Sequence, residues 1–287
     1  MKSKLLVIAG PTACGKSLAA VEIARSVAGA VVVNADSMQV YKDIPIVTSQ
    51  PDEAAREEVE HKLYSICEYD EKMNAAKWAG LAAGIIRQSV NSEQYPIIVV
   101  GGTGMYIDCL VNGISELPEI SAEIRKITAD LAKSNYKELC DCVYRNDEKL
   151  RNSITPDKHR QMQRAHEILL QTGLSIRSFF EGKTISFLDD IPYRIKIIDC
   201  RRDELYARIN TRFRYMIENG AIEEIENLLE KTKHDRNYPL FQAIGVREIC
   251  DYVEGKSNYE TMIQKACTNS RHYAKRQYTW FRRYTNK

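Results

Sequence analysis

The chain has 287 residues, of which 44% are hydrophobic and 28% charged, a composition typical of a folded globular protein. With 41 Lys and Arg against 39 Asp and Glu, its net charge of +2 excludes a uniformly basic or acidic protein. No apolar run is long enough to cross a bilayer, and Met1-Lys2-Ser3-Lys4 leads directly into an apolar segment, so we expect neither a signal peptide nor a membrane partner. The eight cysteines lack zinc spacing, and we expect reduced thiols and a cytoplasmic location.

A phosphate-binding loop follows the first predicted strand. The apolar run Leu5–Ala9 comes before this loop, and a helical pattern from Leu18 to Val27 comes after it. The loop itself is Gly10-Pro11-Thr12-Ala13-Cys14-Gly15-Lys16-Ser17, which matches G-x-x-x-x-G-K-[ST]. Its backbone N–H groups and Lys16 favour phosphate oxygens, and the Ser17 hydroxyl is a ligand for Mg²⁺. The flanking strand and helix disfavour the alternative of a chance glycine-rich turn.

Polar side chains follow the second predicted strand, Val31–Val33. They belong to the run Asn34-Ala35-Asp36-Ser37-Met38-Gln39-Val40-Tyr41. Loops at the carboxyl ends of parallel strands line one crevice, so we expect Asp36 to lie near the phosphate loop. There it could bind Mg²⁺, directly or through water, or act as a general base. The alternative is that Asp36 only caps the next element.

The next strand ends in glycines and a hydroxyl, not in the acidic residue that an ATPase usually places there. A predicted helix from Ala75 to Val90 comes before the apolar strand Pro96–Val100, which runs into Gly101-Gly102-Thr103-Gly104. Glycines let a ligand approach the backbone closely, and Thr103 can donate or accept a hydrogen bond at a substrate heteroatom. A tight turn into the next helix is the simpler alternative.

Helical periodicity dominates from 116 to 192, between Pro118 and Pro192. Glu123–Ser134 and Lys158–Gln171 have amphipathic patterns. We therefore expect an α/β fold, a P-loop NTPase-like parallel sheet flanked by helices, formed by 1–115 and 193–287, with a helical insertion domain at 116–192. The insertion is either a lid over the site or a static subdomain. It carries a candidate RNA-facing stripe that includes Arg160, Gln161, Gln163 and Arg164.

The core resumes with the predicted strand Ile195–Ile198 and a long helix from Glu204 to Asn219. Arginines stand at the start of this helix, and Arg202 and Arg208 are candidate contacts for a leaving pyrophosphate. Arg208 and Arg212 are four residues apart and share a helical face. Surface pairing with nearby Asp203 and Glu204 is the alternative for these arginines.

The last segment, from Thr261 to Lys287, contains no Asp or Glu. Basic residues alternate there with aromatic ones, and the segment includes Lys275, Arg276, Tyr278, Trp280, Phe281, Arg282 and Arg283. Such a mixture can pair with phosphates and stack on bases, which indicates a nucleic-acid partner. The alternative is an amphipathic terminal helix whose aromatic residues pack on the core.

The order of these motifs resembles the tRNA dimethylallyltransferases over nearly the whole chain. The stretches that carry the resemblance are the phosphate loop, Asp36-Ser37-Met38-Gln39-Val40-Tyr41, Gly101-Gly102-Thr103-Gly104-Met105-Tyr106, Arg202-x-x-Leu205-Tyr206-x-Arg208-Ile209, Gln242-Ala243-Ile244-Gly245 and Arg271-His272-Tyr273-Ala274-Lys275-Arg276-Gln277-Tyr278-Thr279-Trp280-Phe281-Arg282. That family transfers a dimethylallyl group from its pyrophosphate to the exocyclic amine of the adenosine 3′-adjacent to the anticodon, in tRNAs reading codons that begin with U.

The resemblance implies that the loop holds dimethylallyl pyrophosphate with Mg²⁺, that Asp36 is the base and that Thr103 assists it. It also implies contacts with the anticodon stem-loop of tRNA from Asp36, Ser37, Met38, Gln39, Arg125, Arg160, Gln161, Met162, Gln163, Arg164, Lys275, Arg276, Trp280 and Arg282. The sequence departs from the family pattern at Cys14, Met105, Gln161 and His166. The sequence contains no match to the zinc-finger extension of eukaryotic relatives, so we expect a bacterial-type cytoplasmic enzyme, and we expect a monomer.

Three other functions use the same loop. A nucleoside or nucleotide kinase would take ATP and need no RNA-binding surface. A related transferase would prenylate free adenine nucleotides. A non-catalytic RNA-binding switch would bind RNA tightly and form no product.

Overall fold

The computed structural model describes residues 5–92, 96–189 and 191–285. Met1-Lys2-Ser3-Lys4, on which the expectation of no signal peptide rests, and the basic residue Lys287 lie outside these ranges. The chain divides into a larger unit, Met1–Asn112 with Phe187–Lys287, and a smaller unit, Gly113–Ser186. These limits differ from the 116 and 192 expected from the prolines, because two short paired strands, β5 (Ile114–Ser115) and β6 (Thr184–Ile185), belong to the smaller unit.

A five-stranded sheet forms the centre of the larger unit, and every neighbouring pair in it is parallel. Its order is β3-β2-β4-β1-β7, with the strands β1 Leu5–Ala9, β2 Val31–Asn34, β3 Glu60–Lys62, β4 Ile97–Gly101 and β7 Tyr193–Ile197. The predicted α/β fold is therefore confirmed. In register, Ala9 lies beside Gly101 and Ile197, so the loops after β1, β4 and β7 leave the sheet at one edge.

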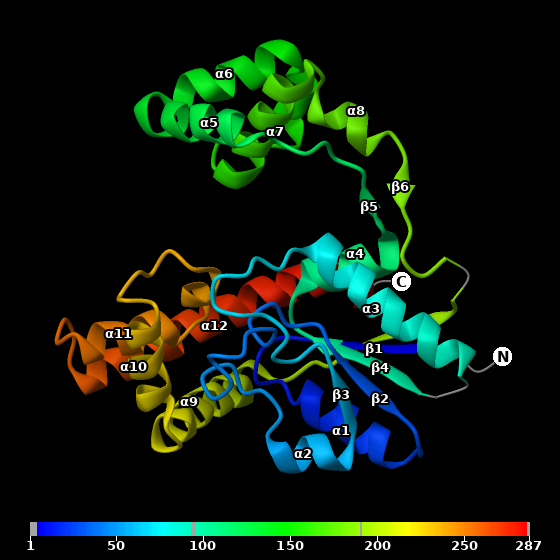
Figure 1. Ribbon diagram of the computed structural model, residues 1–287, viewed down its shortest axis with the longest axis vertical. Coiled ribbons are helices and arrows are strands. Elements are labelled where there is room, and N and C mark those ends of the chain that lie inside the picture. Colours follow the sequence, from blue (N-terminus) through cyan, green and yellow to red (C-terminus); the bar gives the residue numbers. More distant parts are fainter. Residues whose placement is uncertain (1–4, 93–95, 190, 286–287) are drawn as a thin grey trace. The chain divides into compact units, whose positions relative to one another are not determined.

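Helices cover both faces of this sheet (Figure 1). On one face, α1 (Lys16–Arg25) buries Ala20 and Ala24 against strand residues that include Ile8 and Ile98. The other face is covered by α3 (Ala75–Asn91) and α4 (Gly104–Asn112). The short helix α2 (Glu53–Glu58) comes before β3. Layers of helix on both sides explain why the central strands β1, β2 and β4 are almost wholly apolar.

Four α-helices follow β7 in the described part of the chain, and the short 3-10 helix η2 (Pro239–Gln242) lies between the second and the third of them. They are α9 (Arg202–Glu218), α10 (Ala221–Lys231), α11 (Val246–Val253) and α12 (Tyr259–Thr285). Their buried faces form one apolar cluster that includes Phe213, Leu228, Phe241 and Met262. α12 runs past the sheet as far as α4 (Figure 1), and this course brings the C-terminal segment to the phosphate loop.

The smaller unit consists mainly of helices around its own core. These are α5 (Ala122–Ser134), α6 (Tyr136–Asn146), η1 (Glu148–Asn152), α7 (His159–Thr172) and α8 (Ile176–Phe180). Leu139, Met162 and Ile168 are fully buried at its centre. Within the described part of the chain, no helix combines the length and hydropathy that crossing a bilayer requires.

Substituting Gly101 tests how tightly β4 packs on the loop after β2. A Cβ atom at Gly101 would lie 2.1 Å from the Ala35 carbonyl oxygen, so backbone would have to move next to Asp36. We expect Gly101→Ala to lower the free energy of unfolding by about 1–3 kcal/mol, the usual cost of overpacking. Urea denaturation measures this difference.

The matched control is Gly84→Ala within α3, where a Cβ atom would meet no other atom within 4 Å. Because alanine favours a helix over glycine by about 1 kcal/mol, this variant should be as stable as the parent or more so. Equal stability of the two variants would contradict the packing described at Gly101.

Candidate active site

The phosphate loop joins the buried end of β1 to the start of α1. Gly15 begins the helix with φ of +93°, a left-handed conformation that glycine adopts without steric cost. The loop backbone folds back on itself through a hydrogen bond from Cys14 N to the Pro11 oxygen of 3.3 Å. Lys16 Nζ donates to the same oxygen at 3.2 Å. Its ammonium group therefore lies over the loop, where a bound anion would meet it.

Two arginines of α9 reach this loop. Arg212 donates to Thr12 Oγ1 at 2.5 Å, and Arg208 donates to the Cys14 carbonyl oxygen at 3.4 Å while it pairs with Glu204. Arg202, which the sequence suggested beside Arg208, instead donates to the Tyr206 hydroxyl at 3.0 Å. The structure thus brings Arg208 and Arg212 to the loop and leaves Arg202 on the Tyr206 ring.

Burial lowers the pKa of Lys16 and also that of Arg212. The negative charge of Asp36 acts in the opposite direction on both groups, and it does not reverse either shift. Two desolvated cations therefore share one carboxylate at the mouth of the loop. Both side chains are half-buried, and an anionic ligand would stabilise such an excess of positive charge, so the electrostatics fit a polyphosphate group.

Asp36 lies at the carboxyl end of β2 in a hydrogen-bonded turn. Its backbone N–H donates to Asn34 Oδ1 at 2.8 Å, and its Oδ1 accepts from Met38 N at 2.9 Å. Among the residues that the structure describes, its other carboxylate oxygen has no hydrogen-bond partner. The carboxylate is thus oriented by one oxygen and presents the second, which is the geometry that a general base needs.

Thr103 connects the loop after β4 to the loop that carries Asp36. Its Oγ1 accepts from Ser37 N at 2.9 Å and lies 3.3 Å from Ser37 Oγ, and its backbone N–H donates to the Ala35 oxygen at 3.1 Å. The phosphate loop, Asp36 and Thr103 are therefore neighbours at one edge of the sheet. This is the arrangement expected for a site built from loops at strand carboxyl ends.

Gln39 contributes less to this site than the sequence suggested. Its side-chain amide donates to the carbonyl oxygens of Thr48 and Ser49 at 2.8 and 2.9 Å. Both amide hydrogens therefore hold the following loop, and only the acceptor oxygen is left for RNA. Ser37 and Met38 are half-buried beside it.

Sequence reasoning missed two side chains of α12 that face the site, Tyr273 and Gln277. Gln277 Oε1 accepts from Thr12 N, and Gln277 Nε2 donates to the Gly102 oxygen, both at 2.8 Å. Burial raises the pKa of Tyr273, whose hydroxyl interacts with Thr103 and Gln277. The signals in the sequence were their place in the last stretch of the family resemblance and their four-residue spacing on one face of a helix with Phe281, which is fully buried.

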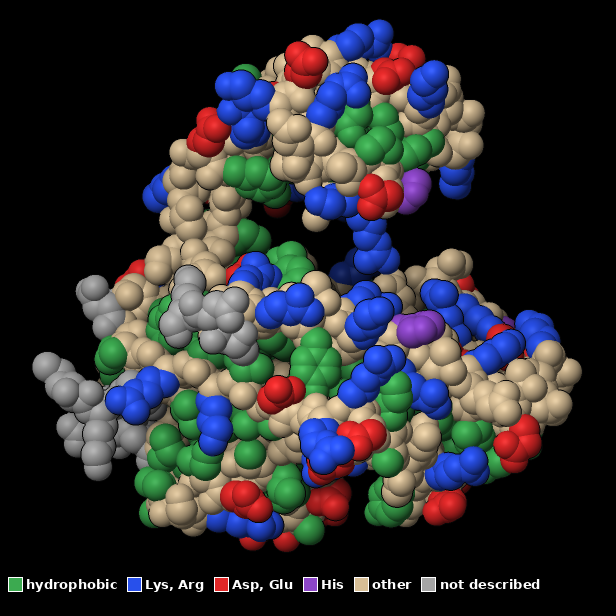
Figure 2. All heavy atoms as spheres, turned by 180° about the vertical axis from the view of Figure 1, so that it is seen from behind, with side chains coloured by type: hydrophobic (Ala, Val, Ile, Leu, Met, Phe, Trp, Pro, Cys, Tyr) green, Lys and Arg blue, Asp and Glu red, His purple; other side chains and the backbone are tan. Residues whose placement is uncertain are grey.

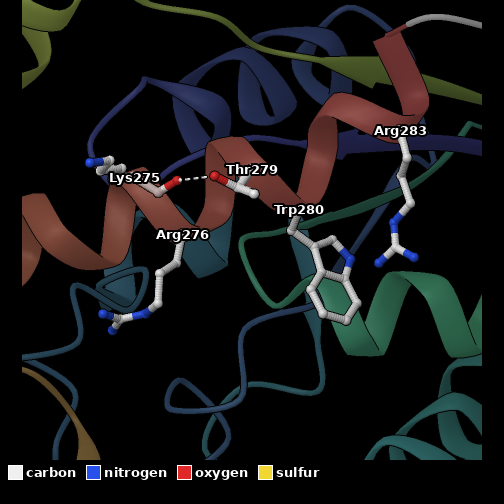
Figure 3. A pocket seen from close by; sticks show the side chains of 5 residues that line it. All are labelled: Lys275, Arg276, Thr279, Trp280 and Arg283. Carbon is white, nitrogen blue, oxygen red and sulfur yellow. Dashed lines mark hydrogen bonds between the residues drawn. The ribbon is translucent and has the colours of Figure 1, made fainter. Parts of the chain in front are cut away.

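The other side of α12 is basic and bears a cavity of about 570 Å³. Lys275, Arg276, Thr279, Trp280 and Arg283 line it (Figure 3). The Trp280 indole packs where a Cβ atom of Gly104 would stand, and the Arg283 guanidinium lies 4.1 Å from the ring centroid. On the larger unit, Lys and Arg side chains follow the course of α12 (Figure 2). Arg282 is exposed on the same helix.

In the smaller unit, the predicted RNA stripe on α7 is exposed only in part. Arg160 and Gln161 are exposed, and Gln163 and Arg164 are half-buried, with Arg164 donating to the Pro118 oxygen at 3.2 Å. Arg125 is exposed on α5. The prediction for Met162 is wrong, because its side chain is 0% exposed and packs in the core of the unit, where it cannot touch RNA.

The fold and the site define a P-loop α/β protein whose phosphate loop stands beside a carboxylate and a basic helix. The model of the IPP transferase family matches residues 39–284, and the chain belongs to that family. It is 37% identical over 283 residues to the tRNA dimethylallyltransferase of Wolbachia pipientis wMel, covering 98% of this chain and 93% of that protein. The tRNA dimethylallyltransferase of Zymomonas mobilis is 34% identical, with 99% and 89% covered.

Solved structures agree with this assignment. The full-length tRNA isopentenylpyrophosphate transferase of Bacillus halodurans is similar with a TM-score of 0.67 and 31% identity, covering 98% of this chain and 87% of that one. A eukaryotic dimethylallyltransferase acting on tRNA has a TM-score of 0.82 and 26% identity, with 98% and 70% covered.

Proposed function

We propose that this protein transfers a dimethylallyl group from dimethylallyl pyrophosphate to tRNA, at the exocyclic amine of the adenosine 3′-adjacent to the anticodon in tRNAs that read codons beginning with U. One observation carries the proposal: the phosphate loop, Asp36 and Thr103 meet at one sheet edge, beside a basic aromatic helix, in a member of the IPP transferase family. Relatives over nearly the whole chain are named tRNA dimethylallyltransferase.

The donor's pyrophosphate binds at the phosphate loop. Backbone N–H groups at the start of α1, Lys16 and Arg212 surround it, and their charge is complementary to the leaving group. When the bond between the allylic carbon and oxygen breaks, negative charge grows on the pyrophosphate. Groups fixed in advance around that charge stabilise the transition state more than the bound donor, and this difference accelerates the reaction.

The acceptor amine is a weak nucleophile because its lone pair is delocalised into the purine ring. As the new bond between nitrogen and carbon forms, Asp36 takes a proton from the amine, and pyrophosphate departs with the electron pair of the broken bond. Thr103 fixes the loop of Asp36 through Ser37 and offers a hydroxyl to the reacting base. To reach these groups the adenosine leaves the stack of the anticodon loop.

The residues at the loop fit Mg²⁺ bound together with the donor. Within the described ranges, the Ser17 hydroxyl makes no hydrogen bond to protein, and no three His, Cys, Asp or Glu side chains form a metal cluster. Mg²⁺ commonly takes one or two protein oxygens and completes its shell with phosphate oxygens and water. Ser17 would be its protein ligand, and the ion would neutralise charge on the leaving group.

The anticodon stem-loop is bound by basic and aromatic residues of α12 and by the exposed residues of α5 and α7. Lys275, Arg276 and Arg283 provide charge for backbone phosphates, and Trp280 provides a ring for stacking. We place the protein in the cytoplasm with its tRNA.

The reaction itself is the test. The full chain is incubated with dimethylallyl pyrophosphate, Mg²⁺ and an anticodon stem-loop, and the RNA is digested for nucleoside mass analysis. We expect dimethylallyladenosine only when the donor is present and the target base is adenosine. Prenylated AMP in place of modified RNA would favour the free-nucleotide transferase, and phosphate transfer from ATP would favour the kinase.

The double variant Lys275→Ala with Arg276→Ala should bind RNA more weakly, and its RNA affinity should depend less on salt concentration. The plot of log K against log salt has a negative slope, and each lost phosphate contact reduces its magnitude by about 0.7–0.9. Filter binding at several salt concentrations measures the slope. Arg25→Ala with Lys62→Ala removes the same charge from the exposed α1–β3 side and should leave the slope unchanged. An unchanged slope in the α12 variant would mean that Lys275 and Arg276 make no contact with RNA phosphates.

A further inference from the structure

Gln277 is a polar side chain buried between two loops of the site. It is 4% exposed, although its neighbours Lys275 and Arg276 on α12 are exposed. Its two hydrogen bonds connect Thr12 N, in the phosphate loop, to the Gly102 carbonyl, next to Thr103. A single amide therefore joins the loop that holds the donor to the loop that faces the acceptor.

The chemistry of the two partners fixes the orientation of this amide. Thr12 N–H can only donate and the Gly102 carbonyl can only accept, so the oxygen of Gln277 faces Thr12 and its nitrogen faces Gly102. The fit is tight, because a Cβ atom at residue 102 would lie 2.2 Å from Gln277 Nε2. The bond to Gln277 also occupies Thr12 N–H, which leaves the N–H groups nearer α1 for phosphate.

An adjoining face of α12 carries the basic cavity lined by Lys275, Arg276 and Trp280. Trp280 packs directly on Gly104, so the helix touches the loop after β4 at two points. α12 is therefore in direct contact with both loops, through Gln277 and Trp280.

We propose that Gln277 is a positioning residue that couples the two substrate sites: RNA bound along α12 strengthens binding of the pyrophosphate group at the phosphate loop, and the donor strengthens binding of RNA. The inference rests on the proposed function for the identity of the two ligands. Coupling of this kind is reciprocal and typically changes affinity by about 5- to 150-fold. Misplacing one loop by about 1 Å can also reduce kcat by about 100-fold.

The first test uses inorganic pyrophosphate with Mg²⁺ as the probe, titrated calorimetrically into the full chain with and without an anticodon stem-loop. In the parent protein, RNA should lower the Kd of pyrophosphate at least about 5-fold. In Gln277→Leu, the two Kd values should be equal, while RNA affinity in the absence of pyrophosphate stays at the parent value. Gln264→Leu, an exposed glutamine on the same helix, is the control and should retain the full coupling.

Gln277→Glu tests the hydrogen-bond pattern itself. A neutral carboxyl group reproduces the amide, because one oxygen accepts from Thr12 N–H while the hydroxyl donates to the Gly102 carbonyl. The ionised form keeps the first bond and turns a negative charge toward that carbonyl. Coupling should therefore be present at low pH in this variant and be lost as the pH rises. Tyr273, Asp36 and Arg212 face the same loops, so the parent protein titrated over the same pH range controls for them.

The inference would be overturned if coupling survived in Gln277→Leu. It would also be overturned if the coupling in Gln277→Glu did not change with pH. If the parent protein forms dimethylallyladenosine and RNA leaves the Kd of pyrophosphate unchanged, this inference fails and the proposed function stands. If no prenylated nucleoside is formed but the coupling is present and depends on Gln277, the proposed function fails and the coupling role of Gln277 stands.

Discussion

Asp36→Asn is expected to reduce the rate of dimethylallyl transfer by about 10²–10⁴ while leaving RNA affinity near that of the parent. An asparagine oxygen still accepts from Met38 N, so the turn after β2 is retained. What is lost is the capacity to take the amine proton, and a positioned general base typically contributes a factor of about 10²–10⁴. Single-turnover assays with saturating protein measure the chemical step apart from binding and product release.

The control for this variant is Asp70→Asn, an exposed carboxylate of the larger unit, which should turn over at the parent rate. A single-turnover rate for Asp36→Asn within a few-fold of the parent would rule out Asp36 as the base. A large loss of RNA affinity in the variant would instead identify Asp36 as a contact needed to hold the base.

Arg212→Gln should reduce kcat/KM by about 10²–10³, the cost of removing one fixed group that stabilises transition-state charge. Arg212 is bound to Thr12 Oγ1 in the phosphate loop, and burial lowers its pKa, so its charge is poorly compensated by protein and water. The pyrophosphate of the donor would supply the missing compensation. Steady-state kinetics with varied dimethylallyl pyrophosphate, and calorimetry with pyrophosphate, should both detect the loss.

Arg202→Gln is the matched control, since it makes the same substitution on the same helix at a residue that lies on Tyr206. Its kinetics should stay within a few-fold of the parent. If Arg202→Gln is the more impaired variant, the assignment of the pyrophosphate contact to Arg212 is incorrect.

The central fold could be predicted because its strands are short apolar runs that end in glycine or polar loops. β1, β2 and β4 lie at the predicted runs, β7 overlaps the run predicted at Ile195–Ile198, and the covering helices follow their apolar spacing. β3 was not predicted, because Glu60-His61-Lys62 carries no apolar signal and its backbone pairing depends on its place at the edge of the sheet. Local sequence cannot report such a tertiary choice.

The site was predicted less completely, for reasons of helical geometry. Arg208 and Arg212 share a face of α9, whereas Arg202 is rotated about 240° from Arg208 and faces another way. Met162 has the spacing of the buried face of α7, together with Ala165 and Ile168, so it packs inward. Gln277 lies in a basic segment among other polar residues, and its sequence position does not predict its partners. Its contacts follow from the position of α12 against the phosphate loop.

The pairing of Ile114 with Ile185 has a consequence for how this architecture can change over time. The chain leaves the larger unit and returns to it through these two paired strands. The two ends of the intervening segment are therefore as close together as the strands of a β-hairpin. Lengthening or remodelling that segment adds little loop-closure entropy. Gly113–Ser186 can therefore change in length or sequence with little effect on the loops that follow β1, β2 and β4 in the larger unit.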